Sequence, residues 1–459
     1  MVKRELMLVN ALPFILAILL VVIYSFDNIV YLIALFAPLS LPLSELMPGL
    51  GFDMFLPTEP LLFGLLIIFL LKLIYVRGFD KQILTHPVSL AVYINLIWIF
   101  FTALTSTMPI VSIKFLLSRI WFVAILYFLT TKMFSEGKNM EKYIWVYVIS
   151  LVIVIFYTIT RHLGYGIWNK EVANFVCNPF YKDHTSYGAA LAMYIPFLLM
   201  FSFGGFVPRK TKIISVIALT ILFIGFVLSY TRAAWLSFIV AGMVYVVIKL
   251  KIRFNPLFIT FVSILVLFLL FQNQIFMSLE QNSEQSSADF KTHISSMANI
   301  TSDASNLERI NRWSCAIRMF KDKPVFGFGP GTYMFQYGSY QLNEDRTIIS
   351  TNSADAGNAH SEYLGPLSES GVLGMLTFLL IIGTVIYTAV HTYMRIKDKR
   401  LKSFVLAALI GLVTYYIHGF LNNFLDTDKL SVPFWGFTAM IVAMDIYSKN
   451  QLKAEKNPD

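Results

Sequence analysis

Residues 143–160 read YIWVYVISLVIVIFYTIT, a run without any charged side chain. About 20 largely apolar residues are enough for an α-helix to cross the hydrocarbon core of a bilayer. Similar runs recur along the chain, whose residues are 57% hydrophobic and only 14% charged. Soluble domains carry roughly 25% charged residues, and a β-barrel would show short alternating segments instead of unbroken apolar runs. The sequence therefore predicts an all-α, polytopic membrane protein.

The apolar runs predict about 12 or 13 transmembrane helices. The count depends on whether two short runs near the N-terminus, 10–25 and 29–43, both cross the membrane. The other spans are expected at 60–76, 87–105, 111–133, 143–160, 186–206, 213–228, 233–250, 257–271, 372–393, 404–419 and 432–447.

A polar insert beginning near Gln274 separates the apolar runs into three predicted parts. These are an N-terminal transmembrane bundle (1–273), a large extracytoplasmic helical loop (274–371), and C-terminal transmembrane helices with a cytoplasmic tail (372–459). Long loops in compact proteins are usually functional or disordered, and the helix signals and clustered Arg residues of this one favour function.

Two helices are predicted within and after the insert. Ser305-Asn306-Leu307-Glu308 has the S-x-x-E form of a capping box. Apolar residues then recur at helical spacing with Arg309 and Arg312 on the other side, and Pro324 should end this helix. A second helix is expected to begin near Asn358, capped by Asn358 or Ser361, and to continue into the next span.

The basic loops predict the orientation. Cytoplasmic loops of membrane proteins are enriched in Lys and Arg, and the chain has a formal net charge of +9. Five basic loops can face the cytoplasm at once, which places the insert on the outer face. Lys3 and Arg4 favour a cytoplasmic N-terminus, so one of the two short N-terminal runs is expected to be re-entrant. The basic residues form no stripe, and a nucleic-acid partner is not expected.

His360 is the leading candidate for catalysis. In the first turn of the expected helix, the positive end of the helix dipole would favour its neutral form, which a general base requires. The alternative is a capping or interfacial His without a chemical role.

Arg232, at the outer mouth of a span, is a candidate anion clamp, since guanidinium binds phosphate oxygens in bidentate fashion. Arg309 could provide a second clamp. The alternative for Arg232 is a side chain that reaches the membrane interface without a chemical role. The alternative for Arg309 and Arg312 is a solvated helix face. Thr231, Arg312, Tyr363 and Asp426 are included as candidate substrate-binding residues.

Two further patterns leave alternatives open. Asp426-Thr427-Asp428 has the D-x-D form of metal-dependent sugar transferases, but this pattern is common by chance, and no metal site or cofactor is predicted. Cys177 and Cys315 both fall on the predicted outer face, so a disulfide is conceivable. Gly327-Phe328-Gly329-Pro330-Gly331 is interpreted as a turn, since no βαβ unit surrounds it.

Three motifs occur in order along the chain. Thr231-Arg232-Ala233-Ala234-Trp235-Leu236 has the form R-x3-L, and His360-Ser361 is followed nine residues on by Gly371-Val372-Leu373-Gly374. These two motifs, with the segment from Arg309 to Gly329, resemble the signatures of the O-antigen ligase and O-antigen polymerase superfamily of bacterial envelope glycosyltransferases. The second signature is H-[NSQ]-x9-G-x-x-[GTY], in which Ser361 replaces the more frequent Asn. Outside residues 230–374 the resemblance rests on the pattern of spans alone.

The resemblance implies an inverting, metal-independent glycosyl transfer at the periplasmic face of the bacterial inner membrane. The donor would be a glycan on undecaprenyl pyrophosphate. His360 would take the proton from the acceptor hydroxyl, while Arg232 and Arg309 would stabilise the departing pyrophosphate.

The acceptor remains open. The leading interpretation is an O-antigen ligase that uses lipid A–core. A polymerase that uses a second lipid-linked repeat unit, or a protein O-glycosylating relative, would share the donor half of the mechanism. A transporter is less favoured, because transporters place ionisable residues near the membrane midplane, whereas Arg232, His360 and Asp426 are expected at one interface.

Overall fold

The structure, a computed structural model, describes residues 26–46, 54–76, 78–251, 304–343, 350 and 357–456. The spans expected at 10–25 and 257–271 lie outside these residues.

Ten helices of the described part are long and apolar enough to cross a membrane. They correspond to the ten remaining full-length spans expected from the sequence and confirm the all-α, polytopic fold class. They are α4 (Thr58–Val76), α6 (Pro87–Leu104), α7 (Pro109–Phe122) with its continuation through the π-helical turn η3 (Val123–Leu129) into α8 (Thr130–Phe134), α9 (Met140–Tyr165), α11 (His184–Phe203), α12 (Arg209–Leu228), α13 (Arg232–Lys249), α18 (Leu364–Arg395), α19 (Lys399–His418) and α20 (Asp428–Lys456).

The short run at 29–43 does not form a full span. Its helix α2 (Phe26–Phe36) has 11 residues and is therefore about 16 Å long, well short of the roughly 30 Å hydrocarbon core. The chain then turns through η2 (Ala37–Leu39), β1 (Leu41–Pro42) and α3 (Leu43–Leu46), and β1 pairs antiparallel with β2 (Phe55–Leu56). The run at 10–25 lies outside the described residues, so the number of N-terminal crossings stays a prediction.

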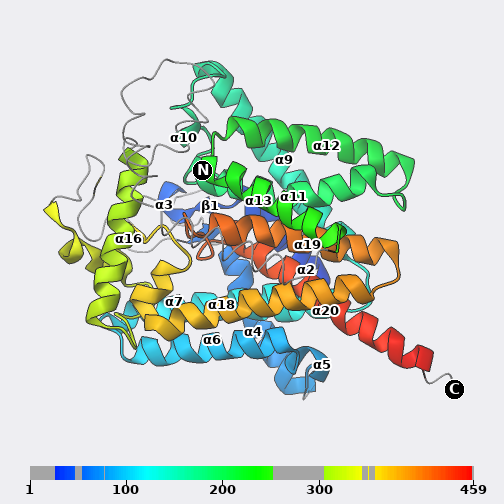
Figure 1. The fold of residues 1–459 in the computed structure, drawn as a ribbon, viewed down its shortest axis with the longest axis horizontal. Coiled ribbons are helices and arrows are strands. Elements are labelled where there is room, and N and C mark those ends of the chain that lie inside the picture. The colour runs from blue at the N-terminus through cyan, green and yellow to red at the C-terminus, as the bar shows by residue number, and fades with distance from the viewer. Residues whose placement is uncertain are drawn as a thin grey trace, which may run out of the picture.

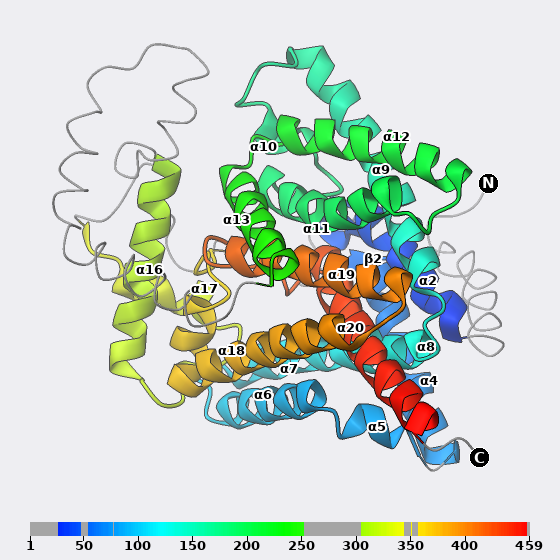
Figure 2. The same ribbon diagram turned by 45° about the vertical axis from the view of Figure 1, so that its right-hand side comes forward.

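Three helices form the centre of the bundle. Most residues of α11, α19 and α20 are buried, whereas only 28% of those in each of α4, α12 and α13 are. Figure 2 shows α19 between α11 and α13 on one side and α18 and α20 on the other. The outer helices expose large apolar side chains such as Leu71, Ile74 and Ile217. A surface of this kind is suited to contact with lipid tails, which offer no hydrogen-bond partners.

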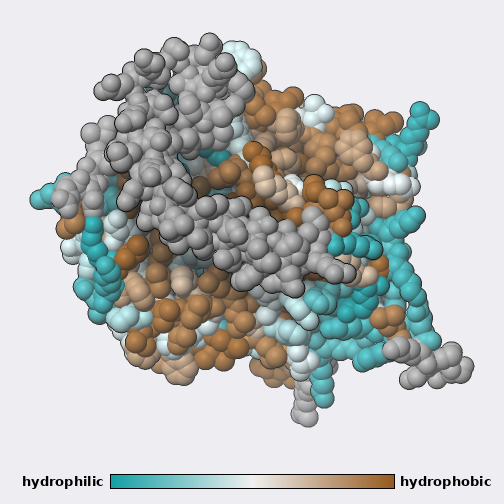
Figure 3. Space-filling model, in the orientation of Figure 1, coloured by the Kyte–Doolittle hydropathy of each residue, from teal (hydrophilic) through white to brown (hydrophobic). Residues whose placement is uncertain are grey.

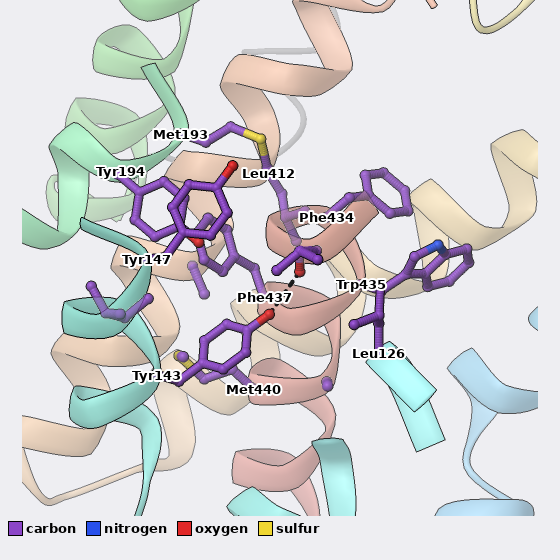
Figure 4. Packing of buried hydrophobic residues seen from close by; sticks show 14 of the residues in the cluster. Leu126, Tyr143, Tyr147, Met193, Tyr194, Leu412, Phe434, Trp435, Phe437 and Met440 are labelled. Atoms are coloured by element: carbon purple, nitrogen blue, oxygen red, sulfur yellow. Dashed lines mark hydrogen bonds between the residues drawn. The ribbon is translucent and has the colours of Figure 1, made fainter. Parts of the chain in front are cut away.

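Tyrosines from α9 bind the backbone of α20 in the core (Figure 4). Pro433 lies inside α20, and its missing N–H leaves the carbonyl four residues earlier, on Lys429, without its helical donor. The Tyr147 hydroxyl donates to that carbonyl at 2.6 Å, and its ring stacks on Tyr194 with 4.3 Å between centroids. One turn along, the Tyr143 hydroxyl donates to the carbonyl of Val432 at 2.8 Å. Tyr147 thus supplies the donor that Pro433 lacks, and Tyr143 adds a second bond between α9 and α20.

The loops segregate to two opposite ends of the bundle. At one end, ion pairs join neighbouring loops and helix ends, including Lys132–Asp80, Arg400–Glu141 and Lys397–Glu455. Hydrophilic side chains gather at this end, on the right in Figure 3, while apolar surface covers the middle. At the other end, α10 (Ala173–Val176) and α16 (Ala304–Asp322) lie near the starts of α11 and α18 (Figure 1). The remaining short helices are α5 (Lys81–Leu84) at the basic end, and α17 (Tyr333–Gln336) and η5 (Tyr337–Tyr340) after α16.

Substituting Tyr147→Phe should lower the free energy of unfolding by about 1–3 kcal/mol, since it leaves the Lys429 carbonyl without a donor in a buried position. Chemical denaturation of the purified protein in detergent measures this change. Tyr194→Phe is the matched control, because the Tyr194 hydroxyl is buried without a hydrogen-bond partner among the described residues. Equal destabilisation by the two substitutions would contradict the role of the Tyr147 hydroxyl.

Candidate active site

His360 lies in the loop just before α18. The helix begins at Leu364, so the prediction that His360 occupies its first turn is wrong. His360 adopts a left-handed backbone with φ 47, which is uncommon for a residue other than glycine. The Asn358 side chain accepts a bond from the His360 N–H at 3.0 Å, and the Trp313 indole donates to the His360 carbonyl at 3.4 Å.

Ser361 caps the start of α18. Its hydroxyl oxygen accepts bonds from the N–H groups of Tyr363 and Leu364, each at 3.3 Å. The expected cap is therefore present, but it serves a helix that starts later than predicted. Because the helix starts later, His360 lies in the loop that leads into α18.

The imidazole of His360 is held in its neutral form. Its pKa is lowered from 6.5 to about 4, mainly by burial and in part by the positive charges of Arg309 and Arg312, while Asp183 and Glu308 act in the opposite direction. The neutral form was expected from the dipole of α18. Its main cause is instead the removal of the ring from water.

The insert helix α16 presents a polar face to the rest of the protein. We predicted an apolar inner face with Arg309 and Arg312 opposite, and this is wrong, since Ile310 and Ile317 are exposed and Arg312 is buried. The buried face comprises Glu308, Asn311, Arg312, Cys315, Ala316 and Met319. Helix α16 ends at Asp322, just before Pro324, as predicted, but it begins at Ala304, so Ser305 lies inside the helix and is not the N-cap of the predicted capping box.

Arg312 joins α16 to the loop that carries His360. Its guanidinium pairs with Glu308 at 2.7 Å, donates to the carbonyl of Asn358 at 3.3 Å, and lies 4.8 Å from the ring centroid of Tyr337. The solvated helix face considered for Arg312 is therefore not what the structure has. Substrate binding by this residue stays a prediction.

Arg232 begins α13 at the same end of the bundle. The preceding Tyr230 has a left-handed backbone with φ 49. The Thr231 hydroxyl donates to the carbonyl of His184 at 2.8 Å, which joins the start of α13 to the start of α11. The positive charges of Arg232 and Arg309 both act on His184. The positive charge of Arg309 therefore acts on both His184 and His360.

Asp183, His184 and His418 were not predicted as site residues. Asp183 caps α11, and its negative charge acts on the imidazoles of His360, His184 and His418. The His418 Nε2 lies 3.1 Å from the amide nitrogen of Asn422. In the sequence, each of these three is simply a polar residue at the end of a span. Polar residues ordinarily occur there, so this position did not mark them as site residues.

The two remaining predicted substrate-binding residues contact other protein groups. Tyr363 stacks on Phe420 with 4.2 Å between centroids, and its hydroxyl donates to the carbonyl of Tyr416 at 2.8 Å. Asp426 pairs with Arg119 at 2.8 Å and is half exposed. Arg119 was missed, because it lies inside an expected span with no motif around it.

The D-x-D pair does not converge. Asp428 is buried and accepts a bond from Ser40 at 2.6 Å, whereas Asp426 faces Arg119. Within the described ranges, no group of three His, Cys, Asp or Glu side chains is arranged to hold a metal ion.

The two cysteines do not pair. Cys177 and Cys315 are both buried and are not joined by a disulfide, so the bridge that the sequence left open is not formed.

The structure explains why the second motif has a glycine at position 371. It has φ 69 within α18 and marks a kink there. A Cβ at this position would lie 2.0 Å from the carbonyl oxygen of Val325, because the Val372 N–H donates to the carbonyl of Pro324 at 3.0 Å. The predicted turn after α16 therefore packs directly on the kink of α18.

The fold and this site define a polytopic membrane protein with histidine and arginine side chains gathered at one end of its helical bundle. Residues 216–379 match the family model described as O-antigen ligase. This match includes Arg232, Arg309 and His360, and it confirms the resemblance to the O-antigen ligase and polymerase superfamily. In a comparison with curated proteins, no match to the chain was found.

Substituting Gly371→Ala should lower the free energy of unfolding by at least about 1–3 kcal/mol, the cost of a left-handed backbone at a residue other than glycine, with the Val325 contact adding to it. Thermal unfolding in detergent measures the loss. Gly383→Ala, on the same helix, is the control, since a Cβ there meets nothing within 4 Å. A Gly371→Ala protein as stable as Gly383→Ala would contradict the proposed need for glycine.

Proposed function

We propose that the protein is a glycosyltransferase of the O-antigen ligase type. It moves a glycan from undecaprenyl pyrophosphate to a hydroxyl of lipid A–core at the periplasmic face of the inner membrane. The observation that carries this proposal is His360, held neutral beside Arg309 and Arg312 within the segment that matches the family. A neutral imidazole flanked by fixed cations suits the transfer of a group from an anionic leaving group.

In the proposed reaction, the acceptor oxygen attacks the anomeric carbon of the donor. The bond between that carbon and the pyrophosphate oxygen breaks, and the acceptor proton passes to His360. The pyrophosphate leaves with the electron pair of the broken bond, and its charge is stabilised by Arg309 and Arg232. Attack opposite the leaving group inverts the configuration at the anomeric carbon.

Binding of the donor makes His360 a stronger base. In the free protein their positive charges oppose protonation of the ring. A bound pyrophosphate offsets these charges, and a nearby negative charge favours the protonated form of an imidazole. Donor binding therefore raises the pKa of His360 toward the range in which a general base works best.

The distribution of basic residues supports the proposed orientation. The Lys- and Arg-bearing loops around Lys132, Arg400 and Lys397 lie at the end of the bundle opposite the candidate site. Since basic loops favour the cytoplasmic side, the site faces the periplasm in this proposal. A lipid-linked donor can then reach it from the outer leaflet.

Substituting His360→Ala should lower the rate of transfer by about 10²–10⁴-fold, the usual contribution of a general base. The assay uses purified protein, a lipid-linked glycan and EDTA, with lipid A–core, a second lipid-linked repeat unit and an acceptor protein as alternative acceptors. His391→Ala is the control, since His391 is exposed near the other end of α18 and bonds only to the Tyr387 carbonyl there among described partners. Full activity of His360→Ala would remove this residue from the mechanism, and strong inhibition by EDTA that Mn²⁺ reverses would refute a metal-independent reaction.

The pH dependence should differ between the free and the donor-bound enzyme. His360 acts only when unprotonated, so kcat/KM for the donor should fall on the acid side near its pKa of about 4, whereas kcat should fall at a higher pH. Arg309→Gln should move the acid limb of kcat/KM upward, because one of the charges that opposes protonation is gone. Steady-state rates between pH 4 and 8 measure both limbs. If the acid limbs of kcat and kcat/KM fell at the same pH, donor binding would not change the pKa of His360, and this prediction would be contradicted.

A further inference from the structure

A polar cavity of about 120 Å³ lies between α7, the start of α18 and the connection from α19 to α20. Its lining includes Phe115, Arg119, Tyr333, Glu369, Asn423 and Asp426. A second cavity of about 50 Å³ shares Phe115, Arg119 and Glu369 with it and continues among apolar residues of the bundle. The two form one recess that none of the predicted motifs identified.

This recess adjoins the loop that carries His360. Asn358 and Ala359, before the histidine, and Ser361, after it, all line the cavity. The Gly331 and Tyr333 N–H groups from the turn after α16 bind the carboxylate of Glu369. The elements that position His360 therefore also build the wall of the recess.

Among the described residues that line the recess, no cation is available to bind a phosphate. Glu362, Glu369 and Asp426 supply three carboxyl groups, and the one guanidinium, that of Arg119, is already paired with Asp426 at 2.8 Å. A pyrophosphate needs complementary positive charge, so in the proposed function it belongs on the side of Arg232 and Arg309.

The lining offers acceptors that a hydroxyl-bearing ligand can satisfy. The Asn423 Oδ1 is buried and has no hydrogen-bond partner in the part of the chain that the structure describes. A carboxylate has about four lone-pair sites, and the two N–H groups bound to Glu369 leave some of them available. Glu362 differs, because its Oε1 already binds the Tyr415 hydroxyl and two backbone N–H groups.

The lining suits one edge of a sugar ring. The rings of Phe115 and Tyr333 give apolar surface beside the acceptors, and a pyranose likewise combines an apolar C–H face with hydroxyls at its edge. A water occupies about 30 Å³ in the liquid, so a cavity of about 120 Å³ has the volume of about four waters. It can therefore take the hydroxyl-bearing edge of a ring, while the rest of the sugar extends out of the recess.

We propose that this recess is a carbohydrate subsite that holds the acceptor glycan through its hydroxyl groups, separate from the arginine side that holds the donor. The proposal rests on the transferase function proposed above. Glu369 and Asn423 are its specificity-determining residues. They accept hydrogen bonds from the sugar, and Arg119 donates to a sugar oxygen at the edge of the recess.

The test compares Asn423→Ala and Glu369→Gln with the wild-type protein. Gln keeps an oxygen that can accept the backbone bonds which Glu369 now receives. Each substitution should raise the KM for the acceptor about tenfold, the effect of losing one hydrogen bond to a bound ligand, and leave the KM for the donor unchanged. Asn450→Ala and Glu136→Gln, exposed residues at the opposite end, should change neither constant.

Binding is measured separately from turnover by saturation-transfer NMR. The probes are core oligosaccharide freed of lipid A and a free repeat-unit oligosaccharide, each added without donor. Signals should appear with wild-type protein and with His360→Ala, and should weaken at least severalfold with either recess variant. A wild-type protein that binds the sugar but does not transfer would refute the proposed function and keep the subsite. Transfer with unchanged acceptor KM in both variants, a raised donor KM, or no sugar signal with wild-type protein would overturn the subsite.

Discussion

The junction between α16 and the loop before α18 is the constraint on which the candidate site depends. Arg312 binds Glu308 in its own helix and the carbonyl of Asn358, and the neighbouring Trp313 binds the carbonyl of His360. A left-handed backbone at a histidine costs roughly 1–3 kcal/mol unless its surroundings hold it. These bonds supply that support, and they add charged contacts to the apolar packing of Cys315, Ala316 and Met319 on the same face of α16.

The membrane helices were predictable because their signal is local. A segment that crosses hydrocarbon must be apolar over about 20 consecutive residues, whatever its neighbours are. Each full-length span expected within the described residues is present, and the run at 29–43 forms a helix too short to span. The capping role of Ser361 and the turn after α16 were also local, and both are confirmed.

The parts that the sequence did not reveal depend on contacts between distant residues. The buried face of α16 contains Glu308, Asn311 and Arg312, so hydrophobic periodicity selected the wrong face. Arg119 and Glu369 line one recess although 250 residues separate them, and neither belongs to a motif. The left-handed backbone of His360 has no sequence signal either, since only the bonds from α16 and Asn358 select it.

In a single-displacement reaction, these contacts between distant residues would serve to place the two substrates. The acceptor must approach the anomeric carbon from the side opposite the leaving group, so donor and acceptor need separate places on either side of the reacting carbon. An anionic leaving group and a neutral, hydroxyl-rich acceptor also need opposite surroundings. In the proposed function, arginines from α13 and α16 take the leaving group, and the recess with Glu369 and Asn423 takes the acceptor through hydrogen bonds. Charge on one side and hydrogen-bond acceptors on the other would then orient the two substrates before any bond changes.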